Sequence, residues 1–240
     1  MSQTFSNIVR DNDRVAATAD LHVEVIADFV CPFCFVGKRN LDEALKAVKG
    51  PSSVNWYPFQ LNPEIPAEGQ PFDVYLTKRF GSPGNVDPVL RHLEEEGRRA
   101  GIDFRFDRIR HVPNTLPIHQ LMQRAEMLGV DQTPLAEDLM SAFFEDGRNI
   151  GELGILIDIA AAHGIAAEEV RDAVASDRIR QNVVTREAQV RSSGLVGAPG
   201  FLVNRRLLVV GAQSTDNIVN AFDRAMFGEG SDSLVSPALN

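Results

Sequence analysis

The chemistry in this sequence centres on Cys31 and Cys34, the only two cysteines in 240 residues. They flank Pro32 and Phe33 and follow an apolar run at 22–27 that is typical of a buried strand. Two thiols at this spacing, at the start of a helix, can form and break a disulfide by mixed-disulfide exchange. Unpaired N–H groups and the positive dipole end of that helix favour a thiolate. We therefore expect Cys31 to be the exposed nucleophile and Cys34 the more buried resolving thiol.

Three neighbouring side chains are candidates for tuning this pair. Phe33 cannot donate a hydrogen bond to the thiolate as a histidine could, so we expect a less stabilised thiolate than in a histidine-bearing motif. Lys38 is a candidate cation, a turn or more down the helix. Asp28 is either a buried carboxylate that relays the proton of Cys34 or a strand-end residue in water, and the sequence favours neither.

A zinc site is the main alternative for a cysteine pair. Zinc needs two further ligands at a fitting spacing, and the chain has no second pair of cysteines. The histidines, which show no metal-like pairing, are His22, His92, His111, His119 and His163. We therefore expect neither a bound metal nor another resident cofactor.

The composition is that of an ordinary globular protein and disfavours several classes of partner. With 33 acidic and 24 basic residues, the formal net charge is −9, which argues against a nucleic-acid surface. No apolar stretch approaches the roughly 18 residues of a membrane span. Residues 1–20 lack the basic start and apolar core of a secretory signal. We therefore expect a cytoplasmic protein with no membrane partner, in a compartment where cysteine pairs are more often catalytic than structural.

The rest of the chain must supply a scaffold for the pair. Strand patterns fall at residues 22–27, 54–59, 201–203 and 207–210. Between the second and third of these, from 63 to 177, the periodicity is helical. One helix there is expected to begin with Asp87 as N-cap and Pro88 as its first residue.

Five phrases, in the same order, resemble the DsbA-like superfamily of thioredoxin-fold proteins, and specifically its cytoplasmic FrnE-type branch. They lie at residues 28–38, 58–63, 114–119, 143–150, and 197–201 followed by 211–213. The resemblance covers residues 21 to 227. It implies an α/β, thioredoxin-like fold with a large inserted α-helical domain.

The implied organisation has four parts, which are a flexible N-terminal arm at 1–20, a thioredoxin-like domain from 21–62 and 178–227, an inserted helical domain at 63–177, and a loose C-terminal tail at 228–240. The resemblance also makes Pro199 a cis-proline that faces the cysteine pair. A cis-proline there exposes the backbone of Ala198 for strand-like pairing with a peptide or with glutathione.

Three more residues are substrate-binding candidates. Asn62 and His119 lie in the family phrases, and a lone histidine on a helix is more often structural than chemical. Trp56 could line a substrate groove, with core packing as the alternative use.

The sequence therefore predicts a thiol–disulfide oxidoreductase whose partners are thiols and disulfides of proteins or small molecules. The alternative is a glutathione-dependent isomerase or transferase of the 2-hydroxychromene-2-carboxylate isomerase or kappa type, with glutathione as co-substrate. Those cousins carry serine in place of the first cysteine, and this chain keeps both. The third hypothesis is a chaperone or binding module that is switched by the redox state of the cysteines. The sequence also allows a homodimer formed through the helical domain.

Overall fold

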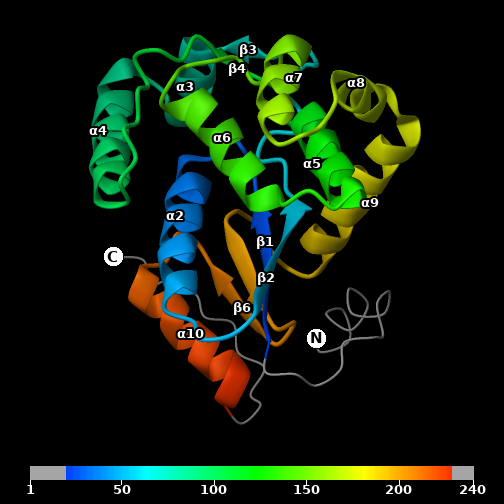
Figure 1. Ribbon diagram of the computed structural model, residues 1–240. Helices are drawn as coiled ribbons and strands as arrows, with labels where there is room; N and C mark the ends of the chain where they lie inside the picture. Colours follow the sequence, from blue (N-terminus) through cyan, green and yellow to red (C-terminus); the bar gives the residue numbers. More distant parts are fainter. Residues whose placement is uncertain (1–19, 229–240) are drawn as a thin grey trace.

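The computed structural model describes residues 20–228, and Figure 1 shows their arrangement. The arm expected at 1–20 and the tail expected at 228–240 fall almost wholly outside this range. Within residues 20–228, no helix combines the length and the apolar character needed to cross a membrane.

A four-stranded mixed sheet forms the centre of the molecule. Its strands are β1 (Leu21–Ala27), β2 (Ser52–Pro58), β5 (Gly200–Val203) and β6 (Leu207–Val210), in the spatial order β2-β1-β5-β6. β1 runs parallel to β2 and antiparallel to β5, and β5 and β6 form an antiparallel hairpin. The central position of β1 means that the segment after Ala27, which carries the cysteines, leaves the sheet between its two halves.

The side chains of β1 alternate between two cores. Val23 and Val25 are almost wholly buried and belong to the main core beneath α2 (Pro32–Lys46) and α10 (Thr215–Phe227), which lie side by side in Figure 1. Ile26 points to the other face and packs in a smaller cluster against Val190 of α9 (Asp177–Ser192). The second face also carries His22 and the buried Glu24, which forms an ion pair with Arg205 at 3.0 Å.

A helical lobe follows β2. It contains β3 (Gln70–Pro71), α3 (Phe72–Phe80), α4 (Pro83–Arg99), β4 (His111–Val112), α5 (Leu116–Leu128), α6 (Gln132–Phe144), α7 (Leu153–Ala162) and α8 (Ala167–Ala175), and α9 (Asp177–Ser192) then returns the chain along β2. The lobe shares the main core with the sheet, since the ring of Phe35 in α2 stacks on that of Phe144 in α6, with centroids 6.1 Å apart. The aromatic contact fixes α2 against the lobe as well as against the sheet.

One helix boundary differs from the expectation. α4 begins at Pro83 with Ser82 as its N-cap, and Pro88 lies inside the helix. Ser82 and Pro83 supply the same pairing of cap and proline earlier in the chain than Asp87 and Pro88. Pro88 is tolerated in the second turn because the proline there removes a single intrahelical hydrogen bond near the helix start.

Candidate functional site

The cysteine pair sits at the N-terminus of α2. Cys31 is the N-cap, with extended backbone angles, and Pro32 is the first residue of the helix. The backbone N–H of Cys34 donates to the Cys31 sulfur at 3.3 Å. This N-cap contact, together with the helix dipole, stabilises negative charge on the Cys31 sulfur. Both cysteines are free thiols in this structure.

Cys31 is not exposed, contrary to the expectation. Its exposed fraction is 3 %, close to the 1 % of Cys34, whereas Phe33 between them is 41 % exposed. The N-cap conformation folds the Cys31 side chain back over the helix end, and the carbonyl oxygen of Ala198 lies 3.8 Å from its sulfur on the other side. Phe33 therefore forms the visible surface of the motif.

The loop opposite the cysteines carries Ala198 and Pro199. The peptide bond between them is cis, and the Pro199 carbonyl accepts a hydrogen bond from Gly211 N–H at 2.8 Å. α2 approaches this loop at Gly37, where an added Cβ would lie 3.1 Å from Pro199 Cγ and 3.0 Å from Phe201 Cζ. The absence of a side chain at Gly37 is what allows the helix to lie so close to the proline.

The resolving thiol is enclosed by protein. The backbone N–H of Asp28 donates to the Cys34 sulfur at 3.5 Å. Burial raises the pKa of the Cys34 thiol well above its ordinary value, and the hydrogen bond with Cys31 raises it further. Cys34 is therefore a protonated thiol at neutral pH in the reduced protein.

Asp28 is a buried carboxylate, which removes the alternative of a strand-end residue in water. Its exposed fraction is 0 %. One carboxylate oxygen accepts from Phe29 N–H at 2.8 Å and the other from Leu61 N–H at 2.7 Å. The first of these oxygens lies 3.6 Å from Nε2 of His119 on α5. Asp28 thus joins the start of the motif to the segment after β2 and to the helical lobe.

The segment after β2 depends on other charged side chains for its backbone hydrogen bonds. Gln60 N–H donates to Glu187 at 2.9 Å, and Arg191 donates to the Gln60 carbonyl while its guanidinium stacks 4.1 Å from the centre of the Phe59 ring. Since Asp28 binds the next N–H, the segment is held rigidly beside the cysteines. The Glu187–Arg191 contribution was not anticipated, because the two residues lie far from this segment in sequence.

Asn62 and Tyr75 lie together beside the site. Burial raises the pKa of the Tyr75 hydroxyl, the neighbouring Asn62 amide opposes this rise, and the charges of Cys31 and Asp28 add to it. Asn62 Nδ2 is buried and has no hydrogen-bond partner within residues 20–228. Asn62 was a candidate from the sequence and Tyr75 was not. Nothing in the pattern of α3 marks Tyr75, which reaches the site because the lobe folds over it.

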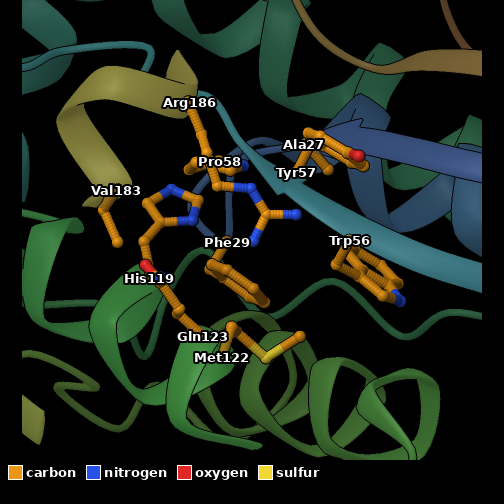
Figure 2. Close-up of a pocket in the computed structure, with 10 residues that line it drawn as sticks. All are labelled: Ala27, Phe29, Trp56, Tyr57, Pro58, His119, Met122, Gln123, Val183 and Arg186. Atoms are coloured by element: carbon orange, nitrogen blue, oxygen red, sulfur yellow. The ribbon is translucent and has the colours of Figure 1, made fainter. Parts of the chain in front are cut away.

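Two candidates take other roles. Trp56 lies in the core, 4 % exposed, where its Nε1–H donates to Thr133 Oγ1 at 3.3 Å and its ring stacks on that of Phe29. Core packing was the alternative use expected for Trp56, and its ring also lines the small cavity beside His119 (Figure 2). Lys38 is also buried, and its ammonium donates to Asp42 at 2.7 Å and to Glu137 of α6. The ion pair with Glu137 joins α2 to α6.

His119 borders a small cavity next to Asp28. Figure 2 shows its ring among the side chains of Phe29, Gln123 and Arg186, in a cavity with space for about one water molecule. The histidine is buried, and its ring packs against Phe29 with centroids 5.2 Å apart. Across residues 20–228, no group of three or more His, Cys, Asp or Glu side chains is arranged to hold a metal ion.

Comparisons with known proteins agree with this geometry. Among curated proteins, an uncharacterized protein, YwbO, of Bacillus subtilis (strain 168) is 25% identical over 211 residues, which are 87% of this chain and 97% of YwbO. A crystal structure of a probable DsbA oxidoreductase from Streptomyces coelicolor has a TM-score of 0.79 and 27% identity, over 90% of this chain and 94% of that one. The structure of the cytosolic disulfide reductase DsbM from Pseudomonas aeruginosa with GSH shares the fold, with a TM-score of 0.56 and 21% identity over 85% and 95% of the two chains.

A family model supplies the assignment. The model for the DSBA-like thioredoxin domain matches residues 22–223, which include both cysteines and all of the sheet except Leu21, the first residue of β1. The fold is accordingly an α/β thioredoxin-like fold with an inserted helical region, and it carries a CxxC-type pair. This chain belongs to the DSBA-like thioredoxin domain family.

Proposed function

We propose that the protein is a thiol–disulfide oxidoreductase in which Cys31 is the nucleophile and Cys34 the resolving thiol. The observation that carries the proposal is the Cys31 sulfur at the N-terminus of α2, bonded to Cys34 N–H at 3.3 Å and facing the Ala198 carbonyl. The N-terminus of α2 and the loop that carries Ala198 lie on either side of the Cys31 sulfur, where a substrate disulfide would be attacked. Family membership and the likeness to a probable DsbA oxidoreductase support the assignment.

The chemistry has two displacement steps. The Cys31 thiolate attacks a substrate disulfide, forms a mixed disulfide and releases one substrate thiolate. Cys34 then loses its proton and attacks the Cys31 sulfur, which releases the second substrate thiolate and leaves a Cys31–Cys34 disulfide. Run in reverse, the same steps oxidise a substrate dithiol. The backbone of Ala198 is placed to pair with an extended substrate segment during both steps.

Finer assignments belong to the same proposal. We place the protein in the cytoplasmic FrnE-type branch, with proteins or small molecules bearing thiols and disulfides as partners and glutathione as a co-substrate. The sequence phrases support the branch, and the shared fold with a cytosolic disulfide reductase crystallised with GSH supports the glutathione. Retention of Cys31, where glutathione isomerases carry serine, favours exchange over isomerisation.

The test is reduction of insulin disulfides by the wild type, Cys31→Ser and Cys34→Ser proteins in the presence of a small dithiol. We expect Cys31→Ser to lose the acceleration, and Cys34→Ser to accumulate a mixed disulfide on Cys31 that intact-mass spectrometry detects. Equal rates for the wild type and Cys31→Ser would falsify the assignment. Suppression of aggregation that survives loss of both thiols would instead favour a binding module.

A further inference from the structure

His119 carries a buried nitrogen that the packing leaves unsatisfied. Its side chain is 3 % exposed, and Nε2 has no hydrogen-bond partner within residues 20–228. Buried polar atoms in native proteins are nearly always paired, and an exception calls for an explanation such as a catalytic role or an ordered water. The atom that Nε2 faces is the Asp28 carboxylate oxygen, 3.6 Å away.

Asp28 connects this imidazole to the resolving thiol. Its backbone N–H donates to the Cys34 sulfur at 3.5 Å, and its carboxylate lies 3.6 Å from His119 Nε2, so this one residue contacts both groups. The carboxylate is fixed by the N–H groups of Phe29 and Leu61 and cannot swing away. Within residues 20–228, His119 is the titratable base adjoining this carboxylate.

Other charged groups near His119 are already neutralised. Arg186 of α9 lines the same cavity, and its guanidinium is paired with Glu126 and lies 4.4 Å from the centre of the Tyr57 ring. Gln123 Oε1 belongs to the same lining and is also buried, with no hydrogen-bond partner within residues 20–228. The cavity beside the imidazole therefore contains a hydrogen-bond acceptor, the Gln123 amide oxygen, and has space for about one water molecule. Arg186 is about one-fifth exposed, which gives this space an edge toward solvent.

We propose that His119 and Asp28 together accept the proton of Cys34 when the mixed disulfide is resolved. The inference rests on the proposed thiol–disulfide exchange. As the Cys34 sulfur attacks Cys31 and the substrate thiolate leaves, the proton of Cys34 passes to the pair. The pair then holds it as an imidazolium beside a carboxylate. The proton leaves to solvent through the cavity after the Cys31–Cys34 disulfide has formed, and no other oxidant than the substrate disulfide is consumed.

The need for such an acceptor follows from the burial of the thiol. Burial raises the pKa of Cys34, so its proton stays on sulfur at neutral pH and must be removed inside the protein. The Asp28 carboxylate opposes a free negative charge on Cys34, which delays ionisation until the attack itself.

The experiment separates the two displacement steps in time. Reduced protein is mixed in a stopped-flow instrument with a chromogenic bis(nitrobenzoate) disulfide, which releases one coloured thiolate when Cys31 attacks and a second when Cys34 resolves. His119→Gln is compared with the wild type over a range of pH. His163→Gln is the matched control, because His163 forms a partly exposed pair with Asp138 at 2.8 Å, away from the cysteines.

We expect His119→Gln to leave the first phase within twofold of the wild type and to slow the second at neutral pH by about tenfold or more, since a positioned proton acceptor commonly contributes about 10²–10⁴-fold. The second phase of the variant should reach its plateau at a higher pH than in the wild type. His163→Gln should match the wild type in both phases. A second phase unchanged within twofold in His119→Gln overturns the inference.

A lack of any second phase in the wild type would instead defeat the proposed exchange function. Should His119→Gln fail to fold, the wild-type pH profile decides. A second phase that rises about tenfold per pH unit up to about pH 10, with no plateau near neutrality, shows that the thiol ionises unaided and overturns the inference.

Discussion

The close approach of α2 to the loop opposite the cysteines predicts the effect of adding one methyl group at Gly37. A Cβ there would lie 3.0 Å from Phe201 Cζ and 3.1 Å from Pro199 Cγ, where carbon atoms at ordinary contact lie about 3.5–4.0 Å apart. Gly37→Ala therefore needs a displacement of several tenths of an ångström between helix and loop. Overpacking of this kind costs about 1–3 kcal/mol.

Alanine also raises the helix propensity at this position. The gain is about 1 kcal/mol in a helix interior, so the net loss for Gly37→Ala is about 0–2 kcal/mol. Gly154→Ala in α7 isolates the steric part, because an added Cβ there meets no heavy atom within 4 Å. Both variants replace a helical glycine, so the comparison cancels most of the gain in propensity, and their free energies of unfolding should differ by about 1–3 kcal/mol, chiefly the overpacking cost.

Thermal and urea unfolding measure this difference. At about 2–4 °C per kcal/mol for a chain of this size, Gly37→Ala should melt some 2 to 12 °C below Gly154→Ala. Insulin reduction should also slow in Gly37→Ala, because the loop that carries Ala198 is displaced, and should be unchanged in Gly154→Ala. Equal melting temperatures and equal rates for the two variants would refute the close-packing argument.

Three further predictions follow from the site. Thr133→Val removes the acceptor of the Trp56 N–H, so the free energy of unfolding measured in urea should fall by about 1 kcal/mol. Insulin reduction should be unchanged, and slower reduction would indicate that Trp56 contributes to a substrate groove. Burial raises the pKa of Tyr75, so above about pH 10 the folded protein keeps a proton that the unfolded chain loses. The free energy of unfolding should therefore fall as the pH rises through that range. Tyr75→Phe should make this fall shallower. A slope identical in the variant would contradict the burial of that hydroxyl. Phe33→His places a donor beside Cys31 at an exposed position, so ultraviolet thiolate absorbance should persist to lower pH than in the wild type; no shift would mean that the exposed side chain does not reach the sulfur.

Features that depend on local chemistry could be predicted from the sequence. The helix start at Cys31 follows from a proline at its first position and a side chain able to cap. The tight turn between β5 and β6 lies at Asn204 and Arg205, where both residues have positive φ, at 48° and 54°. The four strands follow from runs of apolar and β-branched residues. In each case the deciding interactions lie within a few residues of the chain.

Features that depend on packing between distant segments could not be predicted. Lys38 and Glu137 are far apart in sequence, and their ion pair exists because α6 lies over α2. The burial of Cys31 depends on the carbonyl of Ala198, and Tyr75 reaches the site through the fold of the lobe. Periodicity shows which face of a helix is apolar, but not which helix will cover it.

The links that meet at Asp28 have a consequence for the newly made chain. Cys31 and Cys34 lie in the first sixth of the sequence, whereas His119 and Ala198, which complete their surroundings, are synthesised much later. Until then both thiols are open to any alkylating or oxidising reagent. In the finished molecule Cys34 is enclosed by protein, with an exposed fraction of 1 %. The rate at which Cys34 is alkylated therefore reports whether the sheet and the helical lobe have assembled around it.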